Sequence, residues 1–317
     1  MTAHASHTID CDAALPGFTA AYLRVAGDEC AFIETYTTHA LPRLMAALKA
    51  HGKKPEDVRW VVVTHAHLDH AGGASAVLEA CPRATLLAHP RAARHLVDPA
   101  KLIAGATAVY GESKFREMYG EIRPIPAGRV RALEDGETFA LGDATLRVLH
   151  TAGHANHHFV VHDPALDTVF TGDTFGLVYP ALQKRGRFAF PSTSPSNFEP
   201  VEAKKSVDRV MGLGAKVACP THFGEIRDLD EIATQLHAWL DRAEGWLDAA
   251  VKSTDSVAAL TSSLAGAWRA AIAKESDARA LAFDEAAFGF LELDIDLNAQ
   301  GIAVVADMRR KRASASK

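Results

Sequence analysis

The sequence predicts an α/β fold, because short apolar segments that resemble buried strands repeatedly end in a histidine or an aspartate. Four such segments occur before residue 223, whereas the chain after residue 227 is rich in alanine, leucine and charge, which predicts helices. The strands of an open α/β sheet end along one edge, where ligands and catalytic groups gather. We therefore expect a sheet-based domain with a polar site at one edge, followed by helices.

The first of these segments is the most informative, because metal-ligand side chains follow it directly. Residues 60–63 are short, apolar and β-branched, which is typical of a buried strand. The motif THAHLDH then contributes four potential ligands, which are His65, His67, Asp69 and His70. Side chains two residues apart share a face of an extended chain, so the first three can converge on one small volume. The fourth can turn away where a helix begins.

These residue types point to a bound transition metal. Imidazole and carboxylate suit zinc, iron or manganese, and zinc is favoured where histidine dominates. A lone histidine is more often a core or surface residue, but three histidines and an aspartate at this spacing fit a metal site better. The motif therefore predicts a metal-activated water.

The ligand pattern recurs downstream. Residues 145–149 alternate like a half-buried strand and lead to His154, and the apolar residues 168–171 are followed by a glycine and Asp173. A shorter run at residues 216–218 precedes His222. Seven potential ligands can thus meet at one sheet edge.

The remaining elements follow from periodicity and end signals. Gly52 and Pro82 end two short helices, and a largely helical insertion precedes residue 128. Apolar residues recur at helical spacing in the tail. The predicted helical ranges are 40–51, 74–81, 92–119 (the insertion), 228–251, 257–273 and 283–308.

In the order of these motifs the chain resembles the metallo-β-lactamase superfamily. THAHLDH, AGHANHH, FTGD and PTHFG resemble its histidine-rich first motif, its later Gly-His, its aspartate after Thr-Gly and its last histidine. The resemblance extends over roughly residues 15–225. It implies a four-layer αββα sandwich as the catalytic domain, residues 1–227, and leaves residues 228–317 as a helical C-terminal extension.

The resemblance also implies two divalent metal ions per chain, most simply zinc, with iron or manganese as alternatives. His65, His67 and His154 would hold one ion. Asp69, His70 and His222 would hold the second, and Asp173 would bridge them. This chain has Glu34-Thr35-Tyr36 where many members have Asp-Thr-Gly. Glu34 either accepts a hydrogen bond from a ligand imidazole or is a solvent-facing acid.

The resemblance implies a further distinction within the superfamily. True β-lactam hydrolases lack the bridging aspartate, whereas glyoxalase II-like thioesterases, lactonases and phosphodiesterases keep it, as this chain does at Asp173. Residues 153–158 are similar to the Gly-His-Thr-x-Gly-His of glyoxalase II, and residues 193–198 resemble a glyoxalase-like hydrolase branch. We therefore expect a dinuclear metal-dependent hydrolase that cleaves an ester-type bond, with thioester or lactone favoured, through a metal-bridging hydroxide. Asp69 is the expected catalytic residue, because it can orient that hydroxide or carry a proton to the leaving group.

Three alternatives remain open. A phosphodiesterase of the same fold would use the same ligands. A persulfide-dioxygenase-like oxidoreductase would hold one iron. A non-catalytic metal-binding module is disfavoured, because no ligand has been substituted.

Composition narrows the partners. A net charge of −5 and a pI near 6.3 disfavour nucleic acid as a partner. Four scattered cysteines predict free thiols in a reducing compartment, and neither a signal peptide nor a membrane span is evident, so we expect a cytoplasmic protein. The partner should be a small-molecule substrate, and the apolar faces of the tail could form a homodimer.

The segment between Asp173 and the last motif contains the candidate substrate-binding residues Lys184, Arg185 and Arg187 beside two phenylalanines. A loop that connects two ligand-bearing strands should border the site. Guanidinium groups pair well with carboxylate or phosphate, so these side chains are expected to bind an anionic or acyl part of the substrate. A solvated loop is the alternative.

Overall fold

The structure is a computed structural model that describes residues 4–12, 15–193 and 198–315. The chain forms two compact units. The first contains the chain up to His150 together with residues 157–172 and 213–227. The second contains residues 151–156, 173–212 and 228–317, so it combines the predicted C-terminal extension with two earlier segments.

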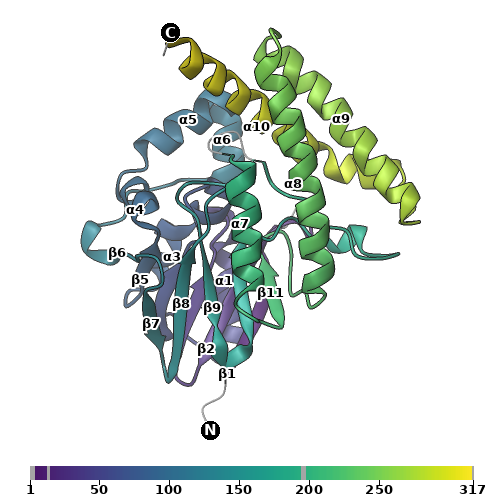
Figure 1. The fold of residues 1–317 in the computed structure, drawn as a ribbon. Coiled ribbons are helices and arrows are strands. Elements are labelled where there is room, and N and C mark those ends of the chain that lie inside the picture. The colour runs from purple at the N-terminus through teal and green to yellow at the C-terminus, as the bar shows by residue number, and fades with distance from the viewer. Residues whose placement is uncertain (1–3, 13–14, 194–197, 316–317) are drawn as a thin grey trace. The chain divides into compact units, whose positions relative to one another are not determined.

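Two mixed β-sheets form the first unit (Figure 1). One has the strand order β1-β2-β3-β4-β5-β6, antiparallel from β1 to β3 and parallel from β3 to β6. The other has the order β11-β10-β9-β8-β7 and is antiparallel except for the pair β10 and β11. The strands are β1 (His4–Asp10), β2 (Ala20–Ala26), β3 (Glu29–Ile33), β4 (Val58–Val62), β5 (Thr85–Ala88), β6 (Val130–Ala132), β7 (Thr138–Leu141), β8 (Ala144–His150), β9 (Phe159–Asp163), β10 (Thr168–Gly172) and β11 (Val217–Pro220).

Helices lie in all the predicted regions, and α2 and α7 are two further helices that the sequence did not predict. The α-helices are α1 (Leu41–Ala50), α2 (Leu68–Ala71), α3 (Ala74–Ala80), α4 (Pro90–Val97), α5 (Ala100–Tyr110), α6 (Glu112–Tyr119), α7 (Pro200–Met211), α8 (Leu229–Lys252), α9 (Val257–Ala278) and α10 (Glu285–Ala315). Short 3₁₀ helices lie at Thr38–Ala40, Pro55–Asp57, Ala127–Arg129, Pro164–Leu166 and Pro180–Leu182. None of the helices in the described part of the chain is long and apolar enough to cross a membrane.

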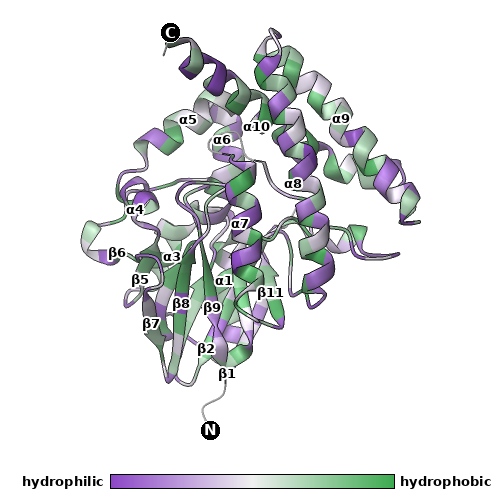
Figure 2. Cartoon of the chain, in the orientation of Figure 1, coloured by the Kyte–Doolittle hydropathy of each residue, from purple (hydrophilic) through white to green (hydrophobic). Residues whose placement is uncertain are grey.

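The core of the first unit has two layers, because alternate side chains of a strand point to opposite faces of its sheet. Tyr22 and Val62 of one sheet pack against Phe159 and Phe170 of the other. The opposite face of the six-stranded sheet packs under α1, α3 and α4, and Phe32 is one of the buried residues of this layer. Strands of both sheets are mainly hydrophobic, whereas α8 and α9 alternate between hydrophobic and hydrophilic residues (Figure 2). The predicted α/β sandwich is therefore confirmed.

In the second unit, α8 packs against α7 and α10, and α9 packs against α10. The indole rings of Trp239 and Trp268 stack with centroids 5.4 Å apart, so these tryptophans are core residues, as predicted. Phe188, from the loop before α7, packs edge-on against Trp239 and Phe283. This loop is therefore anchored in the helical core of its unit.

Candidate functional site

The end of β4 sets the direction of the first ligand motif. The chain bends at Thr64 and His65 after the strand, and His67 is extended, with φ −64° and ψ 147°, as the residue before α2. The ring nitrogens of His65 and His67 nevertheless face each other, so the two side chains converge as predicted. Asp69 lies with His70 in the short helix α2, so the prediction that Asp69 continues an extended run with His65 and His67 is wrong.

Three candidate ligands of the first unit form a compact cluster. One ligand atom each of Asp69, His70 and His222 lies within 4.8 Å of the other two. Asp69 Oδ2 is 3.5 Å from His70 Nε2 and 3.5 Å from His222 Nε2. A tetrahedral zinc site with bonds near 2.0–2.1 Å separates its ligand atoms by about 3.4 Å. Both imidazoles are buried and the Asp69 side chain is 42% exposed, so the cluster fits one metal ion with an open side.

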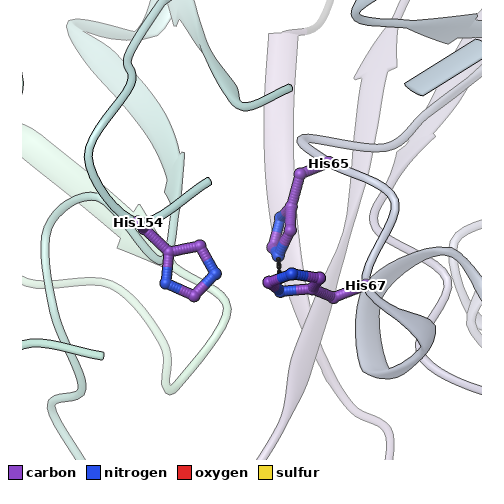
Figure 3. Close-up of side chains that lie close together, drawn as sticks. All are labelled: His65, His67 and His154. Atoms are coloured by element: carbon purple, nitrogen blue, oxygen red, sulfur yellow. Dashed lines mark hydrogen bonds between the residues drawn. The ribbon is translucent and has the colours of Figure 1, made fainter. Parts of the chain in front are cut away.

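His65 and His67 form the second pair of this unit. His65 Nε2 lies 2.8 Å from His67 Nδ1, and Figure 3 marks this contact with a dashed line. The rings are nearly perpendicular, with an interplanar angle of 77°. Two ring nitrogens thus face one another, as expected for side chains that converge on one small volume.

The remaining two ligands belong to the second unit. His154, which Figure 3 also labels, lies on the loop after β8, and Asp173 follows the last residue of β10 directly. His154 Nε2 is 3.4 Å from Asp173 Oδ2, which again matches the ligand spacing of a tetrahedral site. Both side chains are buried.

Glycine is required immediately before each of these two ligands. Gly153 has φ +123°, and a Cβ there would lie 2.2 Å from the backbone nitrogen of Ala203 in α7. Gly172 has φ +52°, and a Cβ there would lie 2.4 Å from His158 Nε2 and 2.5 Å from Thr64 Oγ1. Other residues would clash at both points, so the close approach of the backbone positions His154 and Asp173.

Four of the candidate ligand histidines share one arrangement: Nδ1 contacts an oxygen, and Nε2 faces another candidate ligand. Such outer contacts fix the orientation of a ligand ring and the nitrogen that is free to bind metal. The four Nδ1 contacts are His65 to Thr64 Oγ1 (3.1 Å), His70 to Glu34 Oε1 (3.3 Å), His154 to the carbonyl of Ser192 (3.1 Å) and His222 to the carbonyl of Phe18 (3.0 Å).

The position of Glu34 shows which of its two predicted roles is correct. Its side chain is buried, and Oε1 lies 3.3 Å from His70 Nδ1, accepts a short hydrogen bond from the Thr64 hydroxyl and lies 3.4 Å from Thr221 Oγ1. The solvent-facing alternative is therefore wrong. Glu34 and Tyr36 have φ 67° and 55°, so the turn is kept without glycine at a strain of about 1–2 kcal/mol per residue.

The predicted substrate-binding residues lie in the second unit. Lys184 and Arg185 are exposed, whereas Arg187 Nε is 2.5 Å from Asp228 Oδ2. The neighbouring Phe188 and Phe190 are fully buried, so the expected aromatic surface is not formed by them. Binding of an anionic substrate by the three cations stays a prediction.

Several contacts in the site had no usable signal in the sequence. The carbonyls of Ser192 and Phe18 act through the backbone, so the identity of their side chains says nothing about them. Of the motif at 193–198, residues 194–197 lie outside the described residues. Cys219 is a buried core residue, as predicted, and burial raises the pKa of its thiol well above the usual value.

Comparisons with known proteins agree with this geometry. An archaeal metallo-beta-lactamase superfamily protein from Sulfolobus tokodaii has the same fold, with a TM-score of 0.66 at 21% identity over 95% of this chain and 98% of the other. An atrochrysone carboxyl ACP thioesterase from Aspergillus fumigatus is 25% identical over 61% of this chain and 46% of its own length. A hydroxyacylglutathione hydrolase from Gloeobacter violaceus is 32% identical over 35% of this chain and 32% of its own length.

The chain thus spans less than half the length of these two curated relatives. The sequence matches the family described as "Metallo-beta-lactamase superfamily", and the match extends from residue 14 to residue 222. This range contains all seven histidine and aspartate residues described above as candidate ligands. The chain belongs to the metallo-β-lactamase superfamily.

Proposed function

We propose that this protein is a dinuclear metal-dependent hydrolase that cleaves an ester-type bond, with a thioester as the favoured substrate and a lactone as the second choice. The observation that carries the proposal is the cluster of Asp69, His70 and His222. Its Nε2 and Oδ2 atoms have the spacing of a tetrahedral metal site, and both imidazoles are oriented by oxygens behind them.

We infer that the ligands of the two units act together. His65, His67 and His154 would hold one ion, Asp69, His70 and His222 the other, and Asp173 would be shared. Chain connectivity supports this, because His154 is three residues from His157, a reach of at most about 11 Å in extended chain. His157 Nδ1 in turn lies 3.5 Å from the backbone nitrogen of Ala66, within the first ligand motif.

The protein side chains have distinct tasks in this proposal. When bound, two divalent ions supply a lowered pKa for water and a positive charge that polarises the substrate oxygen. Zinc is the favoured ion, because five of the seven ligands are histidines. The carboxylate of Asp69 lies on the exposed side of its cluster, where it can hold a proton and deliver it to the leaving group.

The names of the relatives support a thioester substrate. One is named an atrochrysone carboxyl ACP thioesterase, and the other is named a hydroxyacylglutathione hydrolase. The acidic net charge of the chain also makes a nucleic-acid phosphodiester a poor substrate.

Metal analysis and a substrate panel test the proposal. Protein purified without chelator should contain two equivalents of metal per chain, and turnover should be highest for thioesters among thioesters, lactones and phosphodiesters. About one equivalent, with no gain on reconstitution, would contradict a dinuclear site. Oxygen uptake with a persulfide, or a preference for phosphodiesters, would contradict the proposed reaction.

Asp69→Asn is the matching variant. Its turnover should fall at least about 100-fold, because the change weakens a ligand and removes a proton carrier, while the melting temperature of the metal-free protein stays unchanged. Asp28→Asn, on an exposed turn between β2 and β3, is the control and should keep wild-type turnover. Wild-type turnover in Asp69→Asn would remove Asp69 from the mechanism.

A further inference from the structure

Asn298 of α10 connects the helical tail to the loop that precedes α7. Its side chain is only 2% exposed, and all of its described contacts lie within the second unit. The backbone nitrogen of Thr193 donates to Asn298 Oδ1 at 2.7 Å, and Asn298 Nδ2 donates to the carbonyl of Pro191 at 2.9 Å. The Thr193 hydroxyl also donates to the backbone carbonyl of Asn298 at 2.8 Å. Asn298 therefore holds the backbone on both sides of Ser192.

The peptide unit between Ser192 and Thr193 links this clamp to a metal ligand. Its N–H donates to Asn298 Oδ1, and its carbonyl, that of Ser192, lies 3.1 Å from His154 Nδ1. A peptide unit is planar, so fixing the direction of its N–H also fixes the direction of its C=O. Hydrogen bonds at the two ends of one amide also polarise and strengthen each other.

The same contact determines the form of the His154 ring. A carbonyl oxygen can only accept, so Nδ1 carries the proton and donates it to Ser192. The lone pair of the neutral ring is then on Nε2, which is the nitrogen that faces Asp173 Oδ2 at 3.4 Å. This is the state in which an imidazole can bind a metal.

We propose that Asn298 is a positioning residue for His154: it fixes the Ser192 carbonyl and, through it, the tautomer and orientation of the ring. The inference rests on the proposed function, in which His154 is a metal ligand. It gives the C-terminal helix α10 an indirect part in metal binding, through the Ser192 carbonyl, although α10 lies far from the ligand motifs in the sequence.

The chain offers a matched control in Gln235 of α8. Gln235 is 8% exposed and clamps the same loop with the same functional group. Its Oε1 accepts from the nitrogen of Ala189 at 2.9 Å, and its Nε2 donates to the carbonyl of Arg187 at 3.1 Å. The peptide unit that it holds directs the Phe188 carbonyl to Gln183, not to a metal ligand. Loss of Gln235 should therefore loosen the loop without releasing His154.

Measurements of metal affinity distinguish the positioning of His154 by Asn298 from the general stabilisation of the loop by Gln235. We expect Asn298→Ala to lose about 10 to 100-fold in affinity for one of its two metal equivalents, measured by chelator competition with Zn²⁺ or Co²⁺, because outer partners of ligands contribute this much. The affinity for the other equivalent should stay within about twofold, and the Co²⁺ absorption spectrum should change for the weakened site only. Gln235→Ala should lower the melting temperature but leave both affinities unchanged.

A second variant keeps the test valid if the alanine variant folds poorly. Asn298→Asp loses the donor to Pro191 and adds a buried charge, but it retains the acceptor for the Thr193 N–H, whose peptide unit holds His154, so it should keep more metal affinity than Asn298→Ala. Wild-type affinity in Asn298→Ala would overturn the proposal. Equal losses in Asn298→Ala and Gln235→Ala would also overturn it, because they would indicate a general effect of loop stability.

Nitrogen NMR of the metal-free protein distinguishes failure of this inference from failure of the proposed function. We expect His154 to be the Nδ1–H tautomer in the wild type and in Gln235→Ala, and to become a mixture in Asn298→Ala. A single Nδ1–H tautomer in Asn298→Ala would contradict the positioning role, whatever metal the protein binds. A wild type with the expected tautomer but fewer than two metal equivalents would contradict the dinuclear proposal alone.

Discussion

At the scale of single residues, the ligand histidines differ in the oxygen behind them. Two contact backbone carbonyls, one contacts a hydroxyl, and His70 contacts the carboxylate of Glu34. A carboxylate raises the basicity of an imidazole more than a neutral oxygen does, because it stabilises positive charge on the ring. The Glu34–His70 pair should therefore make the cluster with Asp69 and His222 the stronger of the two proposed metal sites.

The buried side chain of His89 should make the stability of the protein depend on pH. Burial, reinforced by the nearby His150, lowers the pKa of His89 to about 3, and its Nδ1 accepts a hydrogen bond from the backbone nitrogen of Arg91 at the start of α4. The unfolded side chain titrates near 6.5, so between pH 6.5 and 3 protons bind the unfolded chain preferentially. The free energy of unfolding should therefore fall as the pH decreases through this window, by about 2 kcal/mol at pH 5 from this residue.

His89→Asn measures this contribution, because asparagine can accept the same hydrogen bond but does not titrate. We expect the stability difference between His89→Asn and the wild type to shift in favour of the variant as the pH falls from 7 to 5 in urea unfolding experiments. A difference that does not change with pH would show that His89 titrates normally in the folded protein. Metal-free protein should be used, so that ligand titration does not contribute.

At the scale of elements, the loop between β10 and α7 has an anchored part and an exposed part. Phe188 and Phe190 are buried in the second unit, whereas Lys184 and Arg185 remain in solvent. Arg187 is already paired with Asp228, a half-exposed contact worth about 0–1 kcal/mol. Lys184 and Arg185 can therefore turn to a substrate anion at less cost than Arg187, and of these two Arg185 has the guanidinium group that pairs bidentately with a carboxylate.

Arg185→Ala should raise KM for an anionic thioester and leave KM for a neutral analogue unchanged, with little effect on kcat, since a charge that binds ground state and transition state alike acts on KM. Arg187→Ala should act in the same direction and also lose its ion pair. Arg83→Ala, at an exposed turn of the first unit, serves as the control. Equal KM changes for both substrates, or none for either, would rule out the assigned role.

At the scale of the whole molecule, the proposed ligands come from both units. An ion that binds only the folded chain stabilises it by about 2.7 kcal/mol at 100 times its dissociation constant. For a chain of this size, 1 kcal/mol corresponds to a shift in melting temperature of about 2–4 °C. Saturating Zn²⁺ should therefore raise the melting temperature by several degrees, and chelator should reverse the rise.

His154→Ala tests whether the second unit takes part. The variant should keep only part of the metal-dependent rise, measured by calorimetry at fixed free Zn²⁺, because one of two sites loses a ligand. Asp28→Asn should show the full rise. A full rise in His154→Ala would indicate that the first unit binds metal without the second.

The sequence alone identified the features that depend on short-range patterns. Alternation after residue 63 located His65 and His67, and helical periodicity predicted 228–251 where α8 is Leu229–Lys252. Such patterns are legible because the strand and helix repeats are properties of neighbouring residues. The order of the ligand motifs also predicted the superfamily, and the match over residues 14–222 confirms it.

Tertiary structure alone decided which groups hold the ligands in place. Only the structure shows that Glu34 is buried beside His70 and contacts its ring. Only the structure shows that Phe188 and Phe190 are packed in the core and do not lie on the surface. Asn298 meets Thr193 across 105 residues of chain, through a peptide unit whose carbonyl holds His154. Contacts made by backbone amides and carbonyls leave no trace in residue identity, because every residue has the carbonyl and all but proline the amide, and only the fold determines where they point.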